Sequence, residues 1–395
     1  MDQPLAGVTV LDFGQIYNGP YCGFLLAQAG ARVIKVESPI GEPLRARGEP
    51  STASYAFALL NAGKEGITLN IKSAAGQAIL KRLAREVDVV LENFAPGTMD
   101  RYGIGASALR RENPRLIYAA GTGYGATGPH RDYLGMDLTI QAMSGIMSIT
   151  GREDTPPLKS GAALCDFFGG VHLYGAIVSA LYQRQRTGEG AIIDIAMQDT
   201  VFPTLATALG AYYLNGEQGP RHGNRHPGLS LAPYNVYRAR DGHVAMICIR
   251  EGHWRRLIQA IGQPELGERP EFADMAGRAA HIDAVDALVE AWTEQRTRDE
   301  IFRTMQAHRV ICASVQTLEE VVNDPHLHER GTLAWREHPG LGRIALCRTP
   351  LRYQGMTPPE LTDSPALGAD TQRVLRELGG YGEEEVEALR QAEAY

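Results

Sequence analysis

Residues 8–37 decide the fold class, and they read VTVLDFGQIYNGPYCGFLLAQAGARVIKVE. Val8–Phe13 is a short apolar run that predicts a strand. Tyr21–Ala29 predicts a helix that ends at Gly30, because glycine is favoured just past a helix C-terminus. Arg32–Glu37 is rich in β-branched residues and predicts a second strand. This order of elements indicates a parallel strand pair joined by a crossover helix.

The same alternation continues through the first 200 residues. We expect further strands at Ile67–Ile71, Val87–Leu91, Leu116–Ala120 and Ile192–Ala196, and helices at Ala74–Arg85, Phe167–Arg186 and Gln198–Leu214. The pattern predicts an α/β fold, with a mostly parallel sheet covered by helices on both faces. Ligands of such sheets bind beyond the carboxyl ends of the strands, so functional residues should lie on the loops that follow the strands.

The pattern changes after residue 200. Residues 201–230 contain much Gly, Pro, His and Arg and are predicted to be a connection. A small α+β domain is expected over residues 231–325, with two strands around the turn Asp241-Gly242 and helices at Trp254–Ile261, Ala284–Glu294 and Arg298–His308. Residues 326–395 are expected to be a return linker and C-terminal helices, with strand-like pieces at Thr332–Glu337 and Arg343–Cys347 and helices at Thr371–Leu378 and Glu383–Ala392.

Composition excludes several classes of protein. The formal net charge of -7 argues against a nucleic-acid partner. No apolar stretch approaches the roughly 20 residues that a membrane span needs, so no membrane partner is expected. The five cysteines are widely spaced and form no C-x-x-C pair, and the histidines show no ligand spacing, so neither a disulfide framework nor a metal site is predicted. We expect a cytoplasmic protein with reduced thiols.

Asp166 is the most informative single residue. It is the only formally charged residue between Lys159 and Arg184, and it lies among small and apolar residues just before a long apolar helix. A carboxylate there would meet the positive end of a helix, which favours the anion. The small neighbours would leave room for a ligand. Asp166 is therefore a candidate base or nucleophile, and the alternative is an ordinary helix N-cap.

Three loops that follow strands are candidate binding elements. Tyr17–Pro20 is expected to open a helix and to present backbone N–H groups to an oxyanion or phosphate, and the alternative is an ordinary turn between a strand and a helix. Glu92–Gly97 offers an amide and an aromatic ring for a heterocycle, and Arg101 suits a phosphate. Gly123–Gly128 matches G-x-G-x-x-G, but Pro129 follows where a dinucleotide fingerprint needs an opening helix, so we expect a substrate loop.

With these segments in order, the chain resembles the class III CoA-transferase family, which includes formyl-CoA transferase, carnitine CoA-transferase and 2-methylacyl-CoA racemases. The resemblance covers nearly the whole chain. It is carried by Leu11–Phe13, Asn18–Pro20, Gly30–Glu37, Glu92–Gly97, Asn113–Ile117, Ser160–Asp166, Met197–Asp199, Asp324–Pro325, His338–Gly340 and Leu367–Gly368.

The resemblance implies an assembly and a set of functional residues. It implies a homodimer of two chains interlocked like rings, in which each Rossmann-like large domain spans residues 1–200, binds CoA and is completed by about residues 330–395. Asp166 matches the family's nucleophilic aspartate and Asp137 an acidic residue close to it, and the backbone around Tyr17 and Asn18 would serve oxyanions. The positions that match CoA contacts are Leu69, Lys72, Asn93, Phe94 and Arg101.

The implied reaction needs an acyl-CoA and a free carboxylic acid but no bound cofactor. Asp166 attacks the donor thioester to give a mixed anhydride, and the released thiolate returns to give an aspartyl-CoA thioester. The acceptor acid then attacks that thioester, and a second anhydride passes its acyl group to CoA. Water must be excluded, because it would hydrolyse the anhydride.

The sequence departs from the formyl-CoA transferase pattern at three places. Tyr17 stands where a catalytic glutamine is found, and Ser38 where an arginine contacts CoA. The residues Arg225–Leu229 stand where a four-glycine lid is found. These departures weaken the case for formate and oxalate as substrates.

Two other functions stay open. A 2-methylacyl-CoA racemase needs a histidine base just before the acidic residue that matches Asp137, and Met136 occupies that position. An inert acyl-CoA-binding subunit is the other alternative, and the retained Asp166 argues against it. The basic residues Arg221, Arg225 and His226 are candidates for recognising a second carboxylate, which would make a dicarboxylate such as succinate one substrate. The alternative is an ordinary solvated basic loop.

Overall fold

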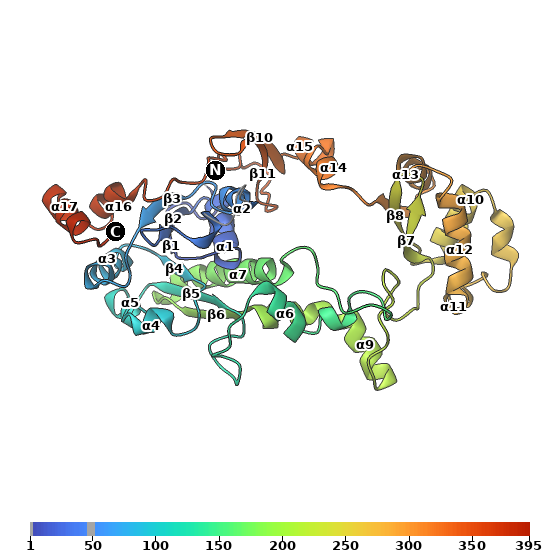
Figure 1. The fold of residues 1–395 in the computed structure, drawn as a ribbon, viewed down its shortest axis with the longest axis horizontal. Coiled ribbons are helices and arrows are strands. Elements are labelled where there is room, and N and C mark those ends of the chain that lie inside the picture. The colour runs from blue at the N-terminus through green and yellow to red at the C-terminus, as the bar shows by residue number, and fades with distance from the viewer. Residues whose placement is uncertain (1–2, 46–51) are drawn as a thin grey trace. The chain divides into compact units, whose positions relative to one another are not determined.

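The computed structural model describes residues 3–45 and 52–395, and the chain divides into two compact units (Figure 1). Unit 1 contains Met1–Ser144, Gly161–Pro203 and Pro325–Tyr395. Unit 2 contains Gly145–Ser160 and Thr204–Asp324. Residues 145–160 were predicted to belong to the large domain but lie in unit 2.

Unit 1 is built on a six-stranded sheet in which every neighbouring pair is parallel. The strand order is β3-β2-β1-β4-β5-β6, so the direction of winding reverses between β1 and β4. The predicted parallel α/β architecture is confirmed. The strands are β1 (Thr9–Asp12), β2 (Arg32–Glu37), β3 (Glu65–Thr68), β4 (Val89–Glu92), β5 (Ile117–Thr122) and β6 (Ile192–Ala196).

Helices bury both faces of this sheet. Alternate residues of a strand point to opposite faces, so neighbouring residues join different hydrophobic clusters. Leu11 and Val90 join one hydrophobic cluster, whereas Val10 and Val89 join another. Helices α3 (Ala74–Ala84) and α5 (Ala106–Glu112) supply the first cluster, and α1 (Asn18–Gln28) and α7 (Leu164–Thr187) supply the second. Figure 1 shows these two groups of helices around the sheet.

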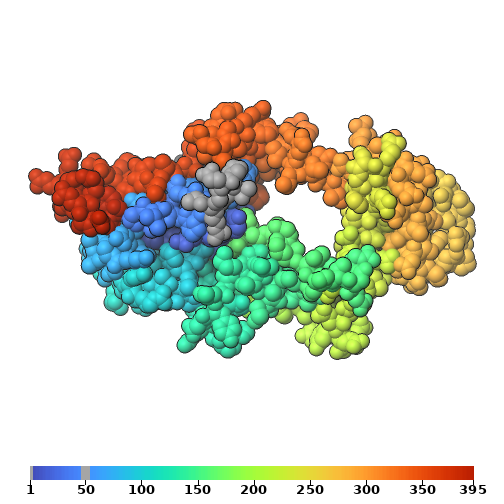
Figure 2. Space-filling view, in the orientation of Figure 1, coloured from blue at the N-terminus to red at the C-terminus, as the bar shows by residue number. Residues whose placement is uncertain are grey.

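The C-terminal part of the chain completes unit 1. An antiparallel hairpin of β10 (Leu333–His338) and β11 (Gly342–Cys347) precedes α16 (Thr371–Glu377) and α17 (Glu383–Gln391). In the space-filling view the red C-terminal residues lie against the blue N-terminal ones (Figure 2).

Residues of this C-terminal segment cover the free edge of β3, which is an edge strand of the sheet. The Gly66 N–H donates to Asp370 Oδ2 at 2.8 Å, and the Thr68 N–H donates to Thr371 Oγ1 at 3.0 Å. Just beyond the strand, the Asn70 N–H donates to the carbonyl of Ala394 at 2.9 Å. Backbone groups that an edge strand would otherwise leave unpaired are thereby satisfied.

Unit 2 has a three-stranded antiparallel sheet, β7 (Tyr234–Ala239), β8 (Gly242–Ile247) and β9 (Ile311–Ser314). Ala239 pairs with Gly242, so the predicted hairpin at Asp241-Gly242 is confirmed. The strand β9 was not predicted. The core is formed with helices α10 (Glu251–Ala260), α12 (Ile282–Thr293) and α13 (Arg298–Ala307).

One predicted helix is broken. Residues 198–214 were expected to form a single helix, but they form α8 (Met197–Val201), a 3₁₀ turn at Phe202–Leu205 and α9 (Ala206–Asn215). Pro203 explains the break, because proline lacks the N–H that a helix interior requires and its ring collides with the preceding turn.

Helix α7 is longer and more apolar than expected, because no stretch long enough to span a membrane was predicted from the sequence. Within residues 3–45 and 52–395 it is the one helix that is long and apolar enough to cross a membrane by length and composition. Leu173, Ile177 and Leu181 repeat every four residues and are buried in the cluster between α7 and the sheet. That spacing is typical of a helix that covers a sheet in a protein core.

Candidate active site

A cavity of about 390 Å³ lies at the carboxyl end of the parallel sheet, where the strand order reverses. Its walls come from loops that follow β1, β4 and β5, as expected for a ligand site in a sheet of this kind. Gly123 of the Gly-rich loop lines the cavity, and the chain stays non-helical after that loop until Asp137. The lining residues are Gln15, Ile16, Asn18, Asn93–Pro96, Gly121–Gly123, Tyr133–Met136, Asp166 and Met197.

Asp166 lies in the first turn of α7 and is 8% exposed. The alternative of a helix N-cap is wrong, because α7 begins at Leu164 and Ala163 is its cap residue. Burial raises the pKa of Asp166 to about 7, and the negative charge of Asp137 adds to the shift. The carboxylate is therefore a much stronger base than an ordinary aspartate and still ionises near neutral pH.

Asp137 is the first residue of α6 (Asp137–Met143) and holds the start of α7. Its Oδ1 accepts the Cys165 N–H at 2.9 Å, and its Oδ2 accepts from Gln141 Nε2 at 2.7 Å. Asp137 thus takes an N–H group of the first turn of α7. Burial and the charge of Asp137 disfavour the Asp166 anion, and together they raise its pKa although Asp166 lies in the first turn of α7.

The glycines after Asp166 have a packing role. Side chains at Gly169 and Gly170 would collide with α1, because a Cβ at Gly169 would overlap Asn18 Nδ2 and one at Gly170 would lie 2.8 Å from the Asn18 carbonyl oxygen. We expected room for a ligand at these positions. Instead, the missing side chains allow α1 and α7 to approach closely.

Asn18 and Tyr17 point to different surroundings. Asn18 lines the cavity and is 2% exposed, and neither Nδ2 nor Oδ1 has a hydrogen-bond partner in the described structure. Tyr17 is absent from the cavity wall; its ring stacks on Phe167 with centroids 6.0 Å apart and packs against Leu44 and Phe57.

The loop between β1 and α1 carries backbone strain. Ile16 has a φ of 64°, which a β-branched residue rarely adopts. Its N–H donates to Glu42 Oε2 at 3.1 Å. The neighbouring Gln15 is held from the other side of the cavity, since its N–H donates to Asn93 Oδ1 at 2.7 Å and its carbonyl accepts from Asn93 Nδ2 at 2.9 Å.

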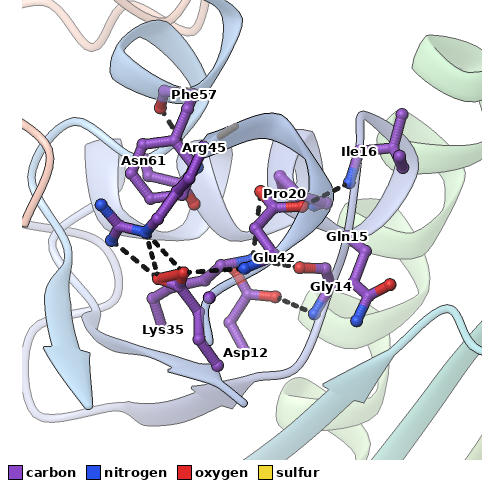
Figure 3. Close-up of polar contacts among 12 residues, drawn as sticks. Asp12, Gly14, Gln15, Ile16, Pro20, Lys35, Glu42, Arg45, Phe57 and Asn61 are labelled. Atoms are coloured by element: carbon purple, nitrogen blue, oxygen red, sulfur yellow. Dashed lines mark hydrogen bonds and ion pairs between the residues drawn. The ribbon is translucent and has the colours of Figure 1, made fainter. Parts of the chain in front are cut away.

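Buried charges lie beneath this loop (Figure 3). Lys64 and Asp12 form an ion pair of 2.7 Å, and both side chains are fully buried. Lys64 also donates to the Pro20 carbonyl and to Asn61 Oδ1, each at 3.0 Å, and Asp12 Oδ1 accepts the Gly14 N–H at 2.7 Å. This pair therefore fixes both ends of the loop.

A second set of charges supports the middle of the loop. Lys35 donates to the Gly14 carbonyl and lies 3.8 Å from Glu42, the residue that holds Ile16. Glu37 accepts the Glu42 N–H at 3.3 Å and pairs with Arg45 through both carboxylate oxygens, at 2.6 and 2.7 Å. Charge-assisted hydrogen bonds therefore hold the backbone of the loop that forms this part of the cavity wall.

Glu92 lies behind the other wall. Burial raises its pKa to about 7, although hydrogen bonds from the Phe94 N–H and the Tyr118 hydroxyl act in the opposite direction. These bonds measure 2.7 and 3.2 Å. Glu92 thereby orients the Phe94 loop, and Phe94 itself lines the cavity.

The five predicted CoA positions are distributed unevenly. Asn93 and Phe94 line the cavity. Leu69 is buried in the core of unit 1, whereas Lys72 and Arg101 are exposed and lie outside the cavity wall. Arg101 donates to Thr98 Oγ1 at 3.1 Å.

The three predicted substrate residues belong to unit 2. Arg225 pairs with Asp283 and Asp286 at 2.6 and 2.7 Å. Arg221 donates to backbone carbonyls of residues 152 and 155, and His226 Nδ1 accepts the Gly228 N–H at 3.2 Å. The charge of Arg225 is therefore already balanced within this unit.

Several residues of the site were not predicted. Ile16, Glu42 and Lys64 gave no motif of their own, and Met197 was named only as part of the resemblance segment Met197–Asp199. One signal was present, because Lys35 lies in the middle of an apolar strand. A charge at such a position needs a buried partner.

Comparisons with known proteins agree over almost the whole chain. The family model described as CoA-transferase family III matches residues 5–371. The chain is 36% identical to succinyl-CoA–D-citramalate CoA-transferase of Chloroflexus aurantiacus, covering 98% of this chain and 97% of the relative. It is 35% identical to succinate–glutarate CoA-transferase of Agrobacterium fabrum, covering 95% and 96%. A crystal structure of a CAIB/BAIF family protein from Brucella suis superimposes with a TM-score of 0.85 at 35% identity, covering 96% of this chain and all of that one.

Proposed function

The chain belongs to CoA-transferase family III, and from that premise we propose that it moves CoA from an acyl-CoA to a free carboxylic acid with Asp166 as the covalent nucleophile. The observation that carries this proposal is the place of Asp166. It is a buried carboxylate with a pKa near 7, in a cavity at the reversal of the parallel sheet.

The raised pKa suits a carboxylate nucleophile. A more basic carboxylate attacks a thioester carbonyl more readily, while a pKa near 7 keeps a large fraction ionised at neutral pH. Attack by an Asp166 oxygen forms the anhydride bond and breaks the C–S bond, and CoA leaves as a thiolate. The thiolate then attacks the Asp166 carbonyl carbon, which releases the donor acid and leaves an aspartyl-CoA thioester.

The second half of the cycle repeats these steps with the acceptor acid. Its carboxylate attacks the aspartyl-CoA carbonyl and displaces the thiolate, which gives the second anhydride. The thiolate attacks the acceptor's acyl carbon in that anhydride, so that the new acyl-CoA leaves and the Asp166 carboxylate is restored. Asp137 supports this chemistry by holding the N-terminus of α7 and by raising the pKa of Asp166.

For CoA itself we propose a path along the carboxyl edge of the sheet. Phe94 offers an aromatic surface in the cavity, and the exposed Lys72 and Arg101 offer positive charge for phosphates. Both polar atoms of the Asn93 side chain are engaged with Gln15, so we assign Asn93 to shaping the wall. Leu69 lies in the core and is assigned backbone contact only.

For the two acids we propose that at least one is a dicarboxylate. Of the relatives described above, one is named for succinyl-CoA and D-citramalate and the other for succinate and glutarate. We infer further that two chains form the interlocked homodimer that the resemblance implied. Large apolar side chains of α9 are exposed within the unit, Tyr213 at 78% and Leu214 at 88%, and such surface favours a partner.

Mass spectrometry after incubation with succinyl-CoA and hydroxylamine tests the nucleophile. We expect a hydroxamate on Asp166 in the wild type and none in Asp166→Asn. Asp299→Ala is the matched control, because Asp299 also lies in the first turn of a helix but is exposed and belongs to unit 2. It should behave as the wild type.

Two results would contradict the proposal. One is an adduct at another residue. The other is no adduct with succinyl-CoA or a panel of acyl-CoAs, and exchange of the α-proton of a 2-methylacyl-CoA would then identify a racemase. Met136 argues against that outcome, because it lines the cavity where the racemase would need a base and a thioether cannot transfer a proton.

A further inference from the structure

Asn18 presents a buried amide that the protein leaves unpaired. Its side chain is 2% exposed, and both Nδ2 and Oδ1 lack a partner within the described residues. A buried polar group without a hydrogen bond opposes folding, so such a group points to a partner that arrives with a ligand.

The amide lies between β5 and α7 at the floor of the cavity. A Cβ at Gly121 of β5 would overlap Asn18 Oδ1, and one at Gly169 of α7 would overlap Asn18 Nδ2. Gly169 follows Asp166 by three residues, which places both on one face of α7. Asn18 and Asp166 both line the cavity. The amide nitrogen is therefore next to the helical turn that carries the nucleophile.

Other asparagines show what a structural amide does in this protein. Asn93 pairs both polar atoms with the backbone of Gln15. Asn113 donates to the carbonyls of Ala84 and Val87 and accepts the Arg115 N–H. Both fix loops through complete pairing. Asn18 fixes nothing in this way, although it is more buried than either.

We infer that Asn18 is a catalytic residue whose Nδ2–H donates to the carbonyl oxygen of the Asp166 adduct. This inference rests on the proposed function and adds the group that receives the developing charge. The carbonyl oxygen of the acylated Asp166 side chain is attached to α7, so its position is the same for every substrate. A donor fixed beside α7 suits that oxygen better than a substrate carbonyl, whose position changes with the acyl group.

The same oxygen becomes charged twice in each cycle. When the CoA thiolate attacks the Asp166 carbonyl carbon, the C–S bond forms and the carbonyl electron pair moves to the oxygen. Collapse of this oxyanion breaks the bond to the bridging oxygen, and the donor acid leaves as a carboxylate. The acceptor carboxylate later attacks the same carbon, and collapse then expels the thiolate. No proton moves in either step.

Rapid mixing with succinyl-CoA distinguishes a donor to the Asp166 adduct from a group that assists the first attack on succinyl-CoA or only binds substrate. A chromogenic thiol reagent reports the first release of CoA, and intact mass after acid quench reports the aspartyl-CoA thioester. In Asn18→Leu, which keeps the shape of the side chain, we expect CoA release at the wild-type rate. Thioester formation and kcat should fall roughly 100- to 1000-fold, as for other lost oxyanion donors. The KM values should change less than about threefold, because ground-state binding does not use the amide.

A matched pair of helix glycines perturbs the amide without changing it. Gly169→Ala displaces Asn18 Nδ2, whereas a Cβ at Gly175 of α7 meets nothing within 4 Å. Gly169→Ala should slow the same steps as Asn18→Leu, and Gly175→Ala should not. Because Asn18→Leu removes an unpaired polar group, its Tm should be no lower than that of the wild type, which excludes simple unfolding as the cause.

The outcomes separate the two hypotheses. A kcat of Asn18→Leu within about threefold of the wild type overturns the role of Asn18, and so does a first CoA release that slows as much as thioester formation. If the wild-type enzyme itself gives neither free CoA nor an aspartyl-CoA adduct, the proposed nucleophile is wrong, and the role of Asn18 falls with it.

Discussion

At the scale of single residues, Asp166 meets two opposing requirements. It must be ionised to attack, yet burial and Asp137 both favour its neutral form. The compromise is a pKa near 7. Activity should therefore increase with pH across the neutral range, because the attacking form is the carboxylate.

Asp137→Asn should shift this dependence. The variant removes the nearby negative charge while an amide oxygen can still accept the Cys165 N–H. With the repulsion gone the pKa of Asp166 decreases, so the increase in kcat/KM should occur at lower pH than in the wild type. Profiles of kcat/KM between pH 5 and 9 for both enzymes measure the shift. An increase that stays in place, or that moves to higher pH, would show that another group controls the rate.

Some single residues were predictable and others were not. Asp166 stood out because its neighbours carry no charge over a long stretch. Asn18 was named through its backbone, but the sequence gives no sign that both polar atoms of its side chain lack partners. The strained φ of Ile16 was also hidden, since isoleucine ordinarily avoids that conformation and nothing in the local sequence requires it.

At the scale of elements, the strands were located well because they are apolar on both faces. Arg32–Glu37 and Ile192–Ala196 have the predicted bounds. The strand expected at Ile67–Ile71 runs from Glu65 to Thr68 instead, because the chain leaves the sheet after Thr68 and Asn70 pairs with the C-terminal segment. Local pattern cannot report a contact with a residue more than 300 positions away.

The partners of buried charged residues could not be predicted from the sequence. Hydrophobic periodicity marks Lys35 as an exception within its strand, but it does not identify Glu42 as the partner. Likewise, Lys64 precedes β3 and meets Asp12 only because β1 and β3 belong to one sheet. Partner choice depends on topology, which the sequence pattern gives only in outline.

The pair of Lys64 and Asp12 predicts a large effect on stability. Lys64→Met leaves the Asp12 carboxylate buried without its cation, which should lower the free energy of unfolding by about 3–5 kcal/mol. Denaturant unfolding measures the loss. Lys159→Met is the control, because Lys159 is exposed, and it should change stability by less than about 0.5 kcal/mol.

A second variant distinguishes charge from packing at this pair. Adding Asp12→Leu to Lys64→Met removes both charges, and most of the lost stability should return. If the double variant is as unstable as Lys64→Met alone, the contribution of this site comes from hydrogen-bond geometry around Gly14 and Pro20.

At the scale of the whole molecule, two buried carboxyls make stability depend on pH. Burial raises the pKa of Asp166 and of Glu92 to about 7 each. In the unfolded chain these groups ionise near pH 4, so between pH 4 and 7 the folded state binds more protons than the unfolded state. The stability that these groups contribute is fully present below pH 4 and is lost as pH increases to 7.

Asp166→Asn should remove this loss. At pH 8 we expect the variant to be more stable than the wild type by roughly 3–4 kcal/mol, and at pH 4 the two should be equal. Urea unfolding at both pH values provides the test. A difference that is the same at pH 4 and pH 8 would mean that titration of Asp166 does not cause it. Glu92→Gln should show the same pH pattern independently of catalysis.

The hydrogen bonds from Asp370, Thr371 and Ala394 to the edge of β3 also have a consequence for synthesis. A ribosome finishes all six strands of the sheet about two hundred residues before it reaches Ala394. Throughout that interval β3 is a nascent strand with an open edge, which is the form that other chains pair with and aggregate. Overproduction of this protein should therefore benefit from chaperones that protect the growing chain until Ala394 emerges, or from weaker expression that keeps the concentration of unfinished chains low.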